Sequence, residues 1–333
     1  MTVLVTGAAG LLGSHIVDLL VEGGERPRAL VRPGERVDHL PPEIDLRTID
    51  IRDAEALGPA LDGVTWVLHC AAKTGPWGPL GDYEATNVRA LEMLVRFAAQ
   101  AGVQRIVHVS SVTVHGNDVR GAADESSPLR VEPNPYSRTK VSGERLLERL
   151  IESDGAPVTI VRPGWIYGPR DVASFGRFAT MIRDGRMVMI GSGTNQVPLI
   201  YVGDAARGVL QAAAADGAVG RSYLLVNDEP VTQRAYLGAI ALALGVPAPT
   251  RRMPYRLALG MGAAAEMAYR ATRRPGPPPV MRYGIQLLGG DNRFNVDRAR
   301  REIGFAPEIG MTEGVRRSVE WYRDTDEQTA RSA

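Results

Sequence analysis

The chain has 333 residues, with 39 basic and 38 acidic side chains and a formal net charge of +1. Such a length can bury a large core and typically forms about two lobes. The arginines are spread among the acidic residues, so nothing favours a nucleic-acid partner. The single cysteine, Cys70, cannot form an internal disulfide and lacks a metal-ligand spacing around it, so we expect no metal site and a reducing compartment.

The chain starts with an apolar strand pattern over residues 3–5, without the basic segment and cleavage site of a signal peptide. We therefore predict a cytoplasmic protein. The most apolar later run, about 257–269, is interrupted by Glu266 and falls short of the roughly 18 to 20 residues that span a bilayer. No integral membrane segment is predicted. Arginines flank this run, so peripheral membrane contact stays open beside the favoured interpretation, a helix packed on its own domain.

A glycine turn follows the first strand and precedes a run with helical periodicity. Three glycines spaced by three let the backbone turn tightly and let a pyrophosphate lie at a helix N-terminus. The motif alone is weak evidence, because other α/β proteins have structural glycine turns. Its position favours a dinucleotide site, and its spacing resembles the short-chain dehydrogenase/reductase superfamily. We expect cofactor contacts from Gly7, Ala9, Gly10, Leu11, Leu12 and Gly13.

The second strand is predicted over residues 29–31, and at its end an NAD enzyme typically carries a carboxylate that binds the adenine ribose. This sequence has Arg32 there, followed by Arg36. A guanidinium can clamp a 2′-phosphate, and one charge-assisted hydrogen bond contributes roughly 1.5 to 3 kcal/mol. We therefore predict a preference for NADP(H), with NAD(H) as the alternative if the arginine is merely solvated.

Two further strands are expected before residue 73. The later one covers about residues 64–72 and ends in small residues that allow close backbone approach to the cofactor. His69 is flanked by apolar residues, so we interpret it as a packed core histidine rather than a general base. The earlier strand ends where members of the superfamily carry an aspartate that contacts adenine. We expect cofactor contacts from both strand ends, at Asp50, Ile51, Ala71 and Ala72.

The segment 73–79 interrupts all periodicity, and loops after the strands of such sheets face the ligand. We predict that Lys73 contacts cofactor and substrate and that Trp77 contacts substrate; plain loop structure is the alternative. Asn87 is then expected to open an apolar helix. It matches an asparagine near the active site of superfamily members, where that residue supports the strand–helix geometry or a water relay.

A tyrosine and a lysine lie four residues apart where another helix is predicted to begin. Pro135 suits the first helical position, Asn134 can cap it, and the apolar pattern ends at residues 154–155. Tyr136 and Lys140 therefore share one face. An ammonium beside a phenol favours the phenolate and lowers its pKa. Alone, this spacing is more often an ordinary exposed pair, but the chain has only two lysines.

The fifth strand, over residues 103–109, leads to Ser111, which lies 25 residues before Tyr136. A serine at a strand end with this tyrosine and Lys140 resembles the proton-transfer triad of short-chain dehydrogenases. In that family the serine hydrogen-bonds the substrate oxygen, and Thr113 is a reserve candidate for this role. Where relatives often have tyrosine, this chain has His115, which we expect to shape the pocket wall.

The resemblance extends over about residues 1–325. Residues 158–169 are similar to the strand and loop at the nicotinamide end, which implies cofactor contact at Pro163 and substrate contact at Ile166. Together the motifs identify an extended short-chain dehydrogenase/reductase, of the NAD-dependent epimerase/dehydratase superfamily. The loop at 71–78 most resembles the 3β-hydroxysteroid dehydrogenase and 2-alkyl-3-oxoalkanoate reductase branch.

This resemblance implies an α/β fold, a Rossmann doubly wound parallel sheet with a smaller discontinuous C-terminal substrate lobe. The cofactor domain is expected over 1–169, with returns near 200–226 and 290–297. The lobe is expected over 170–199, 227–289 and 298–325, followed by a disordered tail over 326–333.

The implied activity is NAD(P)-dependent interconversion of a secondary alcohol and a ketone on an apolar small molecule, steroid-like or like a β-keto acid or ester. Ser111 and Tyr136 hold the substrate oxygen, Tyr136 transfers the proton, and Lys140 lowers the tyrosine pKa and binds the nicotinamide ribose. Asn87 belongs to the same catalytic set. A homodimer is compatible with the family.

Other functions are weighed against this one. A nucleotide-sugar 4-epimerase shares the cofactor machinery, but the missing acid after Val31 counts against tightly retained NAD. A dehydratase is disfavoured because Val112 and Thr113 replace its acid and base. A non-catalytic NADP-sensing protein generally lacks the tyrosine and the lysine.

Overall fold

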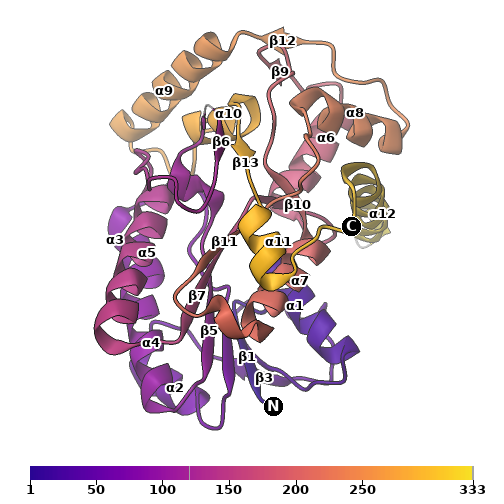
Figure 1. Ribbon diagram of the computed structural model, residues 1–333. Coiled ribbons are helices and arrows are strands. Elements are labelled where there is room, and N and C mark those ends of the chain that lie inside the picture. The colour runs from indigo at the N-terminus through magenta and orange to yellow at the C-terminus, as the bar shows by residue number, and fades with distance from the viewer. Residues whose placement is uncertain (120, 332–333) are drawn as a thin grey trace.

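The computed structural model describes residues 1–119 and 121–331, and its centre is a parallel sheet (Figure 1). Seven strands follow the order β11-β7-β5-β4-β1-β2-β3. The order reverses between β1 and β4, where sheets of this kind form a ligand crevice at the carboxyl ends of the strands. The strands are β1 (Val3–Thr6), β2 (Arg28–Val31), β3 (Asp45–Thr48), β4 (Trp66–His69), β5 (Arg105–Val109), β7 (Val158–Pro163) and β11 (Ser222–Leu225).

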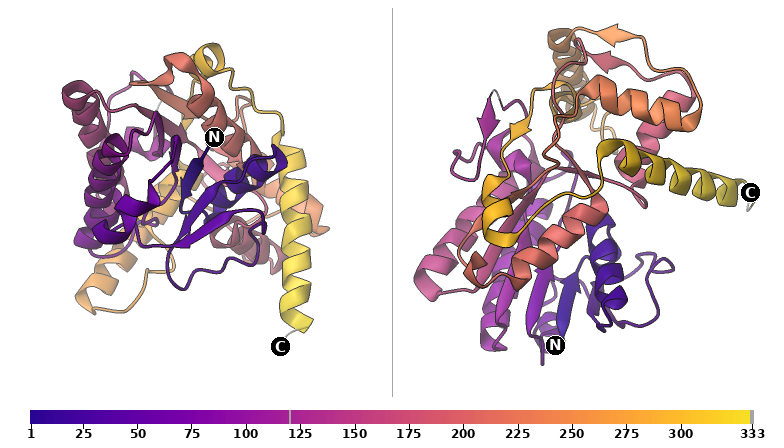
Figure 2. Two further views of the ribbon diagram at one scale, coloured as in Figure 1. Left: turned by 90° about the horizontal axis from the view of Figure 1, so that it is seen from below. Right: turned by 45° about the vertical axis from the view of Figure 1, so that its right-hand side comes forward.

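Helices cover both faces of the sheet, which is why its central strands are apolar throughout rather than alternating (Figure 2). One face packs against α1 (Leu11–Glu22), α7 (Val202–Ala214) and α11 (Asp297–Ile303). The other packs against α2 (Ala54–Ala60), α4 (Ala90–Gln100) and α5 (Pro135–Asp154). The predicted doubly wound α/β fold is confirmed.

A smaller lobe with its own apolar core lies beyond the carboxyl ends of the strands (Figure 1). The lobe contains two short pairs of parallel strands. These are β8 (Trp165–Tyr167) with β10 (Leu199–Tyr201), and β9 (Met189–Ile190) with β12 (Arg252–Met253). Its helices are α6 (Arg177–Arg183), α8 (Gln233–Leu244), α9 (Tyr255–Ala271), α10 (Arg282–Gly289) and α12 (Met311–Arg331). This is the predicted discontinuous lobe, because its segments lie on both sides of α7 and β11 in the sequence.

The remaining elements are short. A parallel pair joins β6 (Ala122–Ala123) to β13 (Arg293–Phe294). Helix α3 runs directly into a π-helical turn that precedes α4. The short helical elements are α3 (Leu80–Glu84), η1 (Ala85–Arg89), η2 (Val112–His115), η3 (Val172–Gly176) and η4 (Asp216–Ala218).

Two boundaries differ from expectation. Asn87 does not open a helix, because the chain is already helical from Leu80. The lobe does not resume at 298, since Ala299 and Phe305 pack in the core of the sheet. Helix α12 extends to Arg331, and residues 332–333 of the expected tail lie outside the described residues, so the disordered tail stays a prediction. None of the helices in the described ranges combines the length and hydropathy that crossing a bilayer demands.

Candidate active site

The glycine turn brings backbone, not side chains, to the start of α1. Gly7 has φ +64°, and a Cβ there would lie 2.8 Å from the Cα of Ala71. A Cβ on Gly13 would collide with the carbonyl oxygen of Gly7. Helix α1 has no side-chain cap and no acidic residue in its first turn. The free amide end and its dipole therefore suit a pyrophosphate, as the sequence predicted.

The end of β2 holds an acid that the sequence analysis missed. Glu35 accepts hydrogen bonds from the Arg32 backbone amide at 3.0 Å and from its guanidinium Nη2 at 2.7 Å. Arg32 and Glu35 are three residues apart, so a single turn of the loop after β2 brings their side chains together. A carboxylate is therefore present where none was expected, and it partly neutralises the arginine. Nearby, Asp50 accepts from Arg52 Nη2 at 2.6 Å, which keeps the pKa of Asp50 below its usual value.

One cavity of about 1180 Å³ joins the glycine turn to the lobe. Most residues predicted to bind cofactor or substrate line it, although they come from distant parts of the chain. These are Gly7, Gly10, Leu11, Leu12, Gly13, Arg32, Asp50, Ile51, Ala71, Ala72, Lys73, Ser111, Thr113, Tyr136, Lys140, Pro163 and Ile166. Ala9 lies instead in a smaller adjoining pocket of about 290 Å³, beside Glu35 and Arg36.

Helix α5 begins where the sequence predicted. The Asn134 side chain accepts from the Ser137 amide at 2.9 Å, and Pro135 occupies the first turn. The helix ends at Gly155, whose φ of +62° is the left-handed conformation of a C-terminal cap. These caps fix the helix, so Tyr136 enters the cavity from its first turn.

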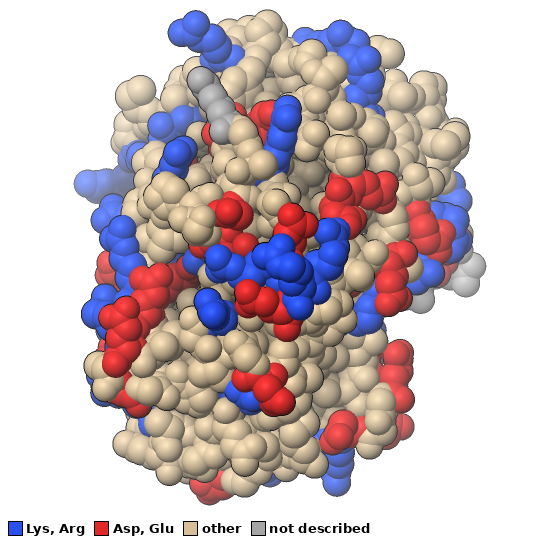
Figure 3. All heavy atoms as spheres, viewed as in Figure 1, with Lys and Arg blue, Asp and Glu red and all other residues tan. Residues whose placement is uncertain are grey.

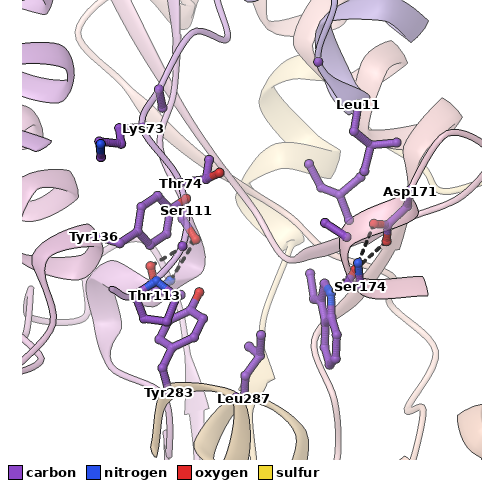
Figure 4. A pocket seen from close by; sticks show the side chains of 18 of the residues that line it. Leu11, Lys73, Thr74, Ser111, Thr113, Tyr136, Asp171, Ser174, Tyr283 and Leu287 are labelled. Atoms are coloured by element: carbon purple, nitrogen blue, oxygen red, sulfur yellow. Dashed lines mark hydrogen bonds between the residues drawn. The ribbon is translucent and has the colours of Figure 1, made fainter. Parts of the chain in front are cut away.

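Ser111 and Tyr136 meet at the carboxyl end of β5 (Figure 4), and Lys140 lines the same cavity. Thr113 Oγ1 donates to Ser111 Oγ at 3.1 Å, and Ser111 lies near enough to Tyr136 to oppose the rise of the tyrosine pKa. Lys140 Nζ donates to the Val109 carbonyl at 2.7 Å and lies 5.9 Å from the centre of the Tyr136 ring. This is the predicted grouping, with Thr113 holding the serine.

The ionisation of the pair differs from expectation. Burial raises the pKa of Tyr136 to about 12, opposed by the hydrogen bond from Ser111. Lys140 does not lower it, because its ammonium points at the Val109 carbonyl. Burial also lowers the pKa of Lys140 to about 8, partly offset by Glu144. Of these two groups, Lys140 is the one that changes charge nearer to neutral pH. The predicted lowering of the tyrosine pKa is absent from this geometry.

Asn87 is placed as a positioning residue. It does not line the cavity. Its Oδ1 accepts from the Lys73 amide at 2.8 Å, and its Nδ2 donates to the Lys73 carbonyl and to Thr139 Oγ1, both at 3.0 Å. Asn87 thus ties the loop after β4 to helix α5, which is the strand–helix support that the sequence offered as one of two roles.

One loop residue and one histidine lie elsewhere than predicted, whereas Lys73 lines the cavity. The Lys73 ammonium pairs with Asp82 at 3.2 Å, outside the triad (Figure 4). Trp77 does not line the cavity; its ring lies 5.3 Å from the guanidinium carbon of Arg270. His115 does not line it either, because its Nε2 is 3.3 Å from Arg162 in a buried network. Loop and strand-end positions in the sequence do not fix side-chain direction.

His69 is a core histidine, as predicted. Its Nδ1 is 2.7 Å from Thr6 Oγ1, and its ring stacks on His108 with centres 5.3 Å apart. Burial lowers the pKa of His69 to about 3, with a smaller contribution from Lys140. It is neutral at physiological pH and serves packing.

The lobe supplies cavity residues that the sequence analysis did not single out. Tyr283 on α10 meets the Tyr136 ring edge-on with centres 6.4 Å apart, and burial raises its pKa (Figure 4). The rest of this wall is mostly apolar, and its most frequent residue is methionine. The lining methionines are Met181, Met187, Met253, Met261 and Met281. The only feature of the sequence that could have indicated this wall is the methionine-rich composition of the lobe segments, and composition does not identify which residues line a cavity.

Comparisons with known proteins agree with this geometry. A family model described as NAD dependent epimerase/dehydratase family matches residues 3–225. The chain is 30% identical over 331 residues to a 2-alkyl-3-oxoalkanoate reductase of Stenotrophomonas maltophilia, covering 95% of this chain and 98% of the relative. It is 28% identical over 353 residues to a 3 beta-hydroxysteroid dehydrogenase/Delta 5-->4-isomerase of Mycobacterium tuberculosis, covering 99% and 93%.

A solved structure shows the same fold. DesIV, the dTDP-glucose 4,6-dehydratase of Streptomyces venezuelae with NAD and TYD bound, matches with a TM-score of 0.79 and 26% identity, covering 98% of both chains. The chain therefore belongs to the NAD dependent epimerase/dehydratase family, the extended short-chain dehydrogenases/reductases, and is an NAD(P)-dependent oxidoreductase.

Proposed function

We propose that this protein is a ketoreductase or alcohol dehydrogenase whose substrate is an apolar ketone or secondary alcohol, steroid-like or like a β-keto acid or ester. One observation carries the proposal: a single cavity has the glycine turn and the triad on one side and a methionine-rich wall on the other. Its relatives are named as a 2-alkyl-3-oxoalkanoate reductase and a 3 beta-hydroxysteroid dehydrogenase, which agrees with such a substrate.

In this proposal a bound nicotinamide cofactor supplies or accepts the hydride. Ser111 and Tyr136 hold the substrate oxygen by hydrogen bonds, and Tyr136 gives its proton to that oxygen in reduction. A tyrosine with a pKa of about 12 is protonated at neutral pH, so it carries the proton that reduction consumes. Lys140, one helical turn away, holds positive charge beside the site and binds the ribose. Asn87 positions the loop through its three hydrogen bonds.

The cofactor preferred in this proposal is NADP(H), with Arg32 and Arg36 as the ligands of the 2′-phosphate. Glu35 opposes this preference, since it occupies the Arg32 guanidinium and can itself accept from ribose hydroxyls. Dissociation constants of NADPH and NADH, measured by fluorescence titration of the wild type and Arg32→Gln, test the assignment. We expect NADPH to bind tighter and to weaken about tenfold in the variant, with NADH little changed. Tighter binding of NADH to the wild type contradicts it.

A nucleotide-sugar 4-epimerase is the second candidate, because Glu35 weakens the earlier argument against retained NAD. The lobe wall argues against it. Arg177 is the one cation of the described lobe that lines the cavity, and its guanidinium donates to the Pro279 carbonyl at 2.8 Å. A sugar diphosphate needs charged partners, whereas methionine side chains bind apolar groups.

The decisive experiment is NADPH oxidation measured against a steroid ketone, a β-keto ester and a nucleotide sugar. We expect turnover with one of the two apolar classes and none with the sugar. Epimerisation of a nucleotide sugar without net cofactor consumption contradicts the proposal and supports the second candidate.

A further inference from the structure

Helix α9 is held to the protein by one narrow edge. A Cβ on Gly262 would lie 2.9 Å from Ile285 Cδ1, so α10 packs directly against its backbone. Beside it, Glu266 pairs with Arg282 at 2.7 Å. Within the helix only Ala258, Gly262 and Glu266 are buried. Five more residues of the helix are half-buried, and the remaining nine are exposed, at the periphery of the lobe (Figure 1).

That outward surface is unusually apolar for a solvent-exposed helix. Leu257 is 56% exposed, Met261 47% and Met267 67%, and Val280 in the following loop is 42% exposed. Leu257 and Met261 are four residues apart and share one row of the helix. Nine large hydrophobic residues are exposed in the described part of the chain, and these four all come from one short segment.

The same segment is strongly basic, although the whole chain is near neutral. Residues 251–282 hold seven arginines and a single acidic residue, Glu266, which pairs with Arg282. The other six arginines are exposed, and within the described ranges none lies at ion-pair distance from a carboxylate. In Figure 3 the rim of the lobe is mostly tan and blue, whereas red gathers lower on that face. The six are Arg251, Arg252, Arg256, Arg270, Arg273 and Arg274.

The segment also borders the apolar end of the cavity. Met261 and Val280 are both exposed and part of its lining, and Ala258 and Met281 line it from the same elements. An apolar molecule held in a bilayer could therefore pass between these side chains without crossing water. The entry of an apolar substrate from the bilayer rests on the proposed function, whereas the exposed apolar and basic surface is independent of it.

We propose that residues 251–280 form a docking face that binds the surface of an anionic bilayer, with α9 lying in the plane of the headgroups and the mouth of the cavity against the lipid. Exposed apolar side chains enter the acyl boundary, and arginines pair with lipid phosphates, as in other interfacial helices. A second copy of the chain fits less well. A two-fold interface would place this face against itself, and the arginines would repel one another.

The test is co-sedimentation of the full-length protein with vesicles of phosphatidylcholine alone and of phosphatidylcholine mixed with phosphatidylglycerol. We expect binding to the mixed vesicles that weakens with added salt, and little binding to the neutral ones. Arg256→Gln with Arg273→Gln and Arg274→Gln should weaken it roughly a hundredfold, at about fivefold per arginine. Leu257→Asp with Met267→Asp should weaken it at least tenfold.

Controls separate this face from folding and from catalysis. Leu242→Asp changes a residue on α8 that is 80% exposed and should leave vesicle binding unchanged. None of the changed residues lines the cavity, so thermal unfolding and turnover of a small water-soluble ketone should match the wild type. No binding to the anionic vesicles, or binding that every variant retains, overturns the proposal. So does a dimer in solution that Leu257→Asp with Met267→Asp converts to monomers. Vesicle binding is measured without substrate, so its failure is distinguishable from failure of the proposed function.

Discussion

The two walls of the cavity differ in how firmly their side chains are held. On the sheet side, hydrogen bonds hold the side chains: Lys140 donates to the Val109 carbonyl on β5, and Ser111 accepts from Thr113 in the turn that follows it. On the lobe side most lining residues are apolar, and methionine is unbranched, with three rotatable bonds. A hydrogen bond fixes direction, whereas apolar contact constrains only volume. In the proposed function, the reacting groups are therefore preorganised, and the wall that selects the substrate is adaptable.

The largest expected effect lies on the fixed side. Tyr136→Phe removes the proton donor and should lower kcat for ketone reduction by about a hundred- to ten-thousandfold, the usual contribution of general acid catalysis. The ring is kept, so NADPH should bind about as tightly as in the wild type. Stopped-flow reduction and fluorescence titration measure the two quantities. Tyr269→Phe, on α9, is the matched control; undiminished turnover in Tyr136→Phe rules out the catalytic assignment.

The loss of folding stability at low pH should also come from the part of the chain that forms the sheet side, because all five histidines lie in the first 115 residues. The folded-state pKa of His69, about 3, is below its ordinary 6.5, so the unfolded chain binds the extra proton. Stability is then full above about pH 6.5 and falls as the pH drops toward 3. The loss from His69 alone is roughly 2 kcal/mol at about pH 5.

Urea unfolding of the wild type and His69→Gln between about pH 7.5 and pH 5 measures this loss. Glutamine can still accept from Thr6 but does not titrate. The variant should therefore lose about 2 kcal/mol less than the wild type over that interval. Equal losses in both proteins show that His69 is not the group responsible.

A smaller effect is expected where the sequence and the structure disagreed, at the end of β2. Glu35→Gln removes the carboxylate that occupies Arg32, so NADPH should bind several-fold tighter, with about tenfold as the upper bound. NADH should bind weaker, since an acceptor for the ribose hydroxyls is lost. Glu92→Gln, which changes only an exposed ion pair with Arg96 on α4, outside the cavity, is the control. If both cofactors respond alike, Glu35 does not discriminate between them.

The smallest effect should come from the adaptable wall. Met253→Ala removes part of one lining side chain, and its flexible neighbours can fill the space, so KM for a large apolar ketone should rise only about fivefold. The KM for a small ketone and the NADPH affinity should not move. Initial rates over a range of ketone concentrations give these values. A fall in kcat of a hundredfold or more shows that this wall is fixed like the opposite one.

The sequence by itself determined the parts of this protein that follow local backbone rules. Asn134 and Pro135 start helix α5 where predicted, because capping and the fixed proline φ act within a few residues. The glycine turn and the run of parallel strands likewise depend on short spacing and apolar pattern. Ser111 could be placed with Tyr136 and Lys140 because the order of strands in this fold is known from the resemblance.

Only the tertiary structure decided where side chains point and what surrounds them. Glu35 closes on Arg32, Trp77 turns to Arg270, and five methionines from separate segments form one wall. Helix α9 was expected to pack on its own domain, and it does so only along the edge around Gly262. These contacts join residues far apart in the chain, and their geometry depends on packing, which periodicity and spacing do not encode.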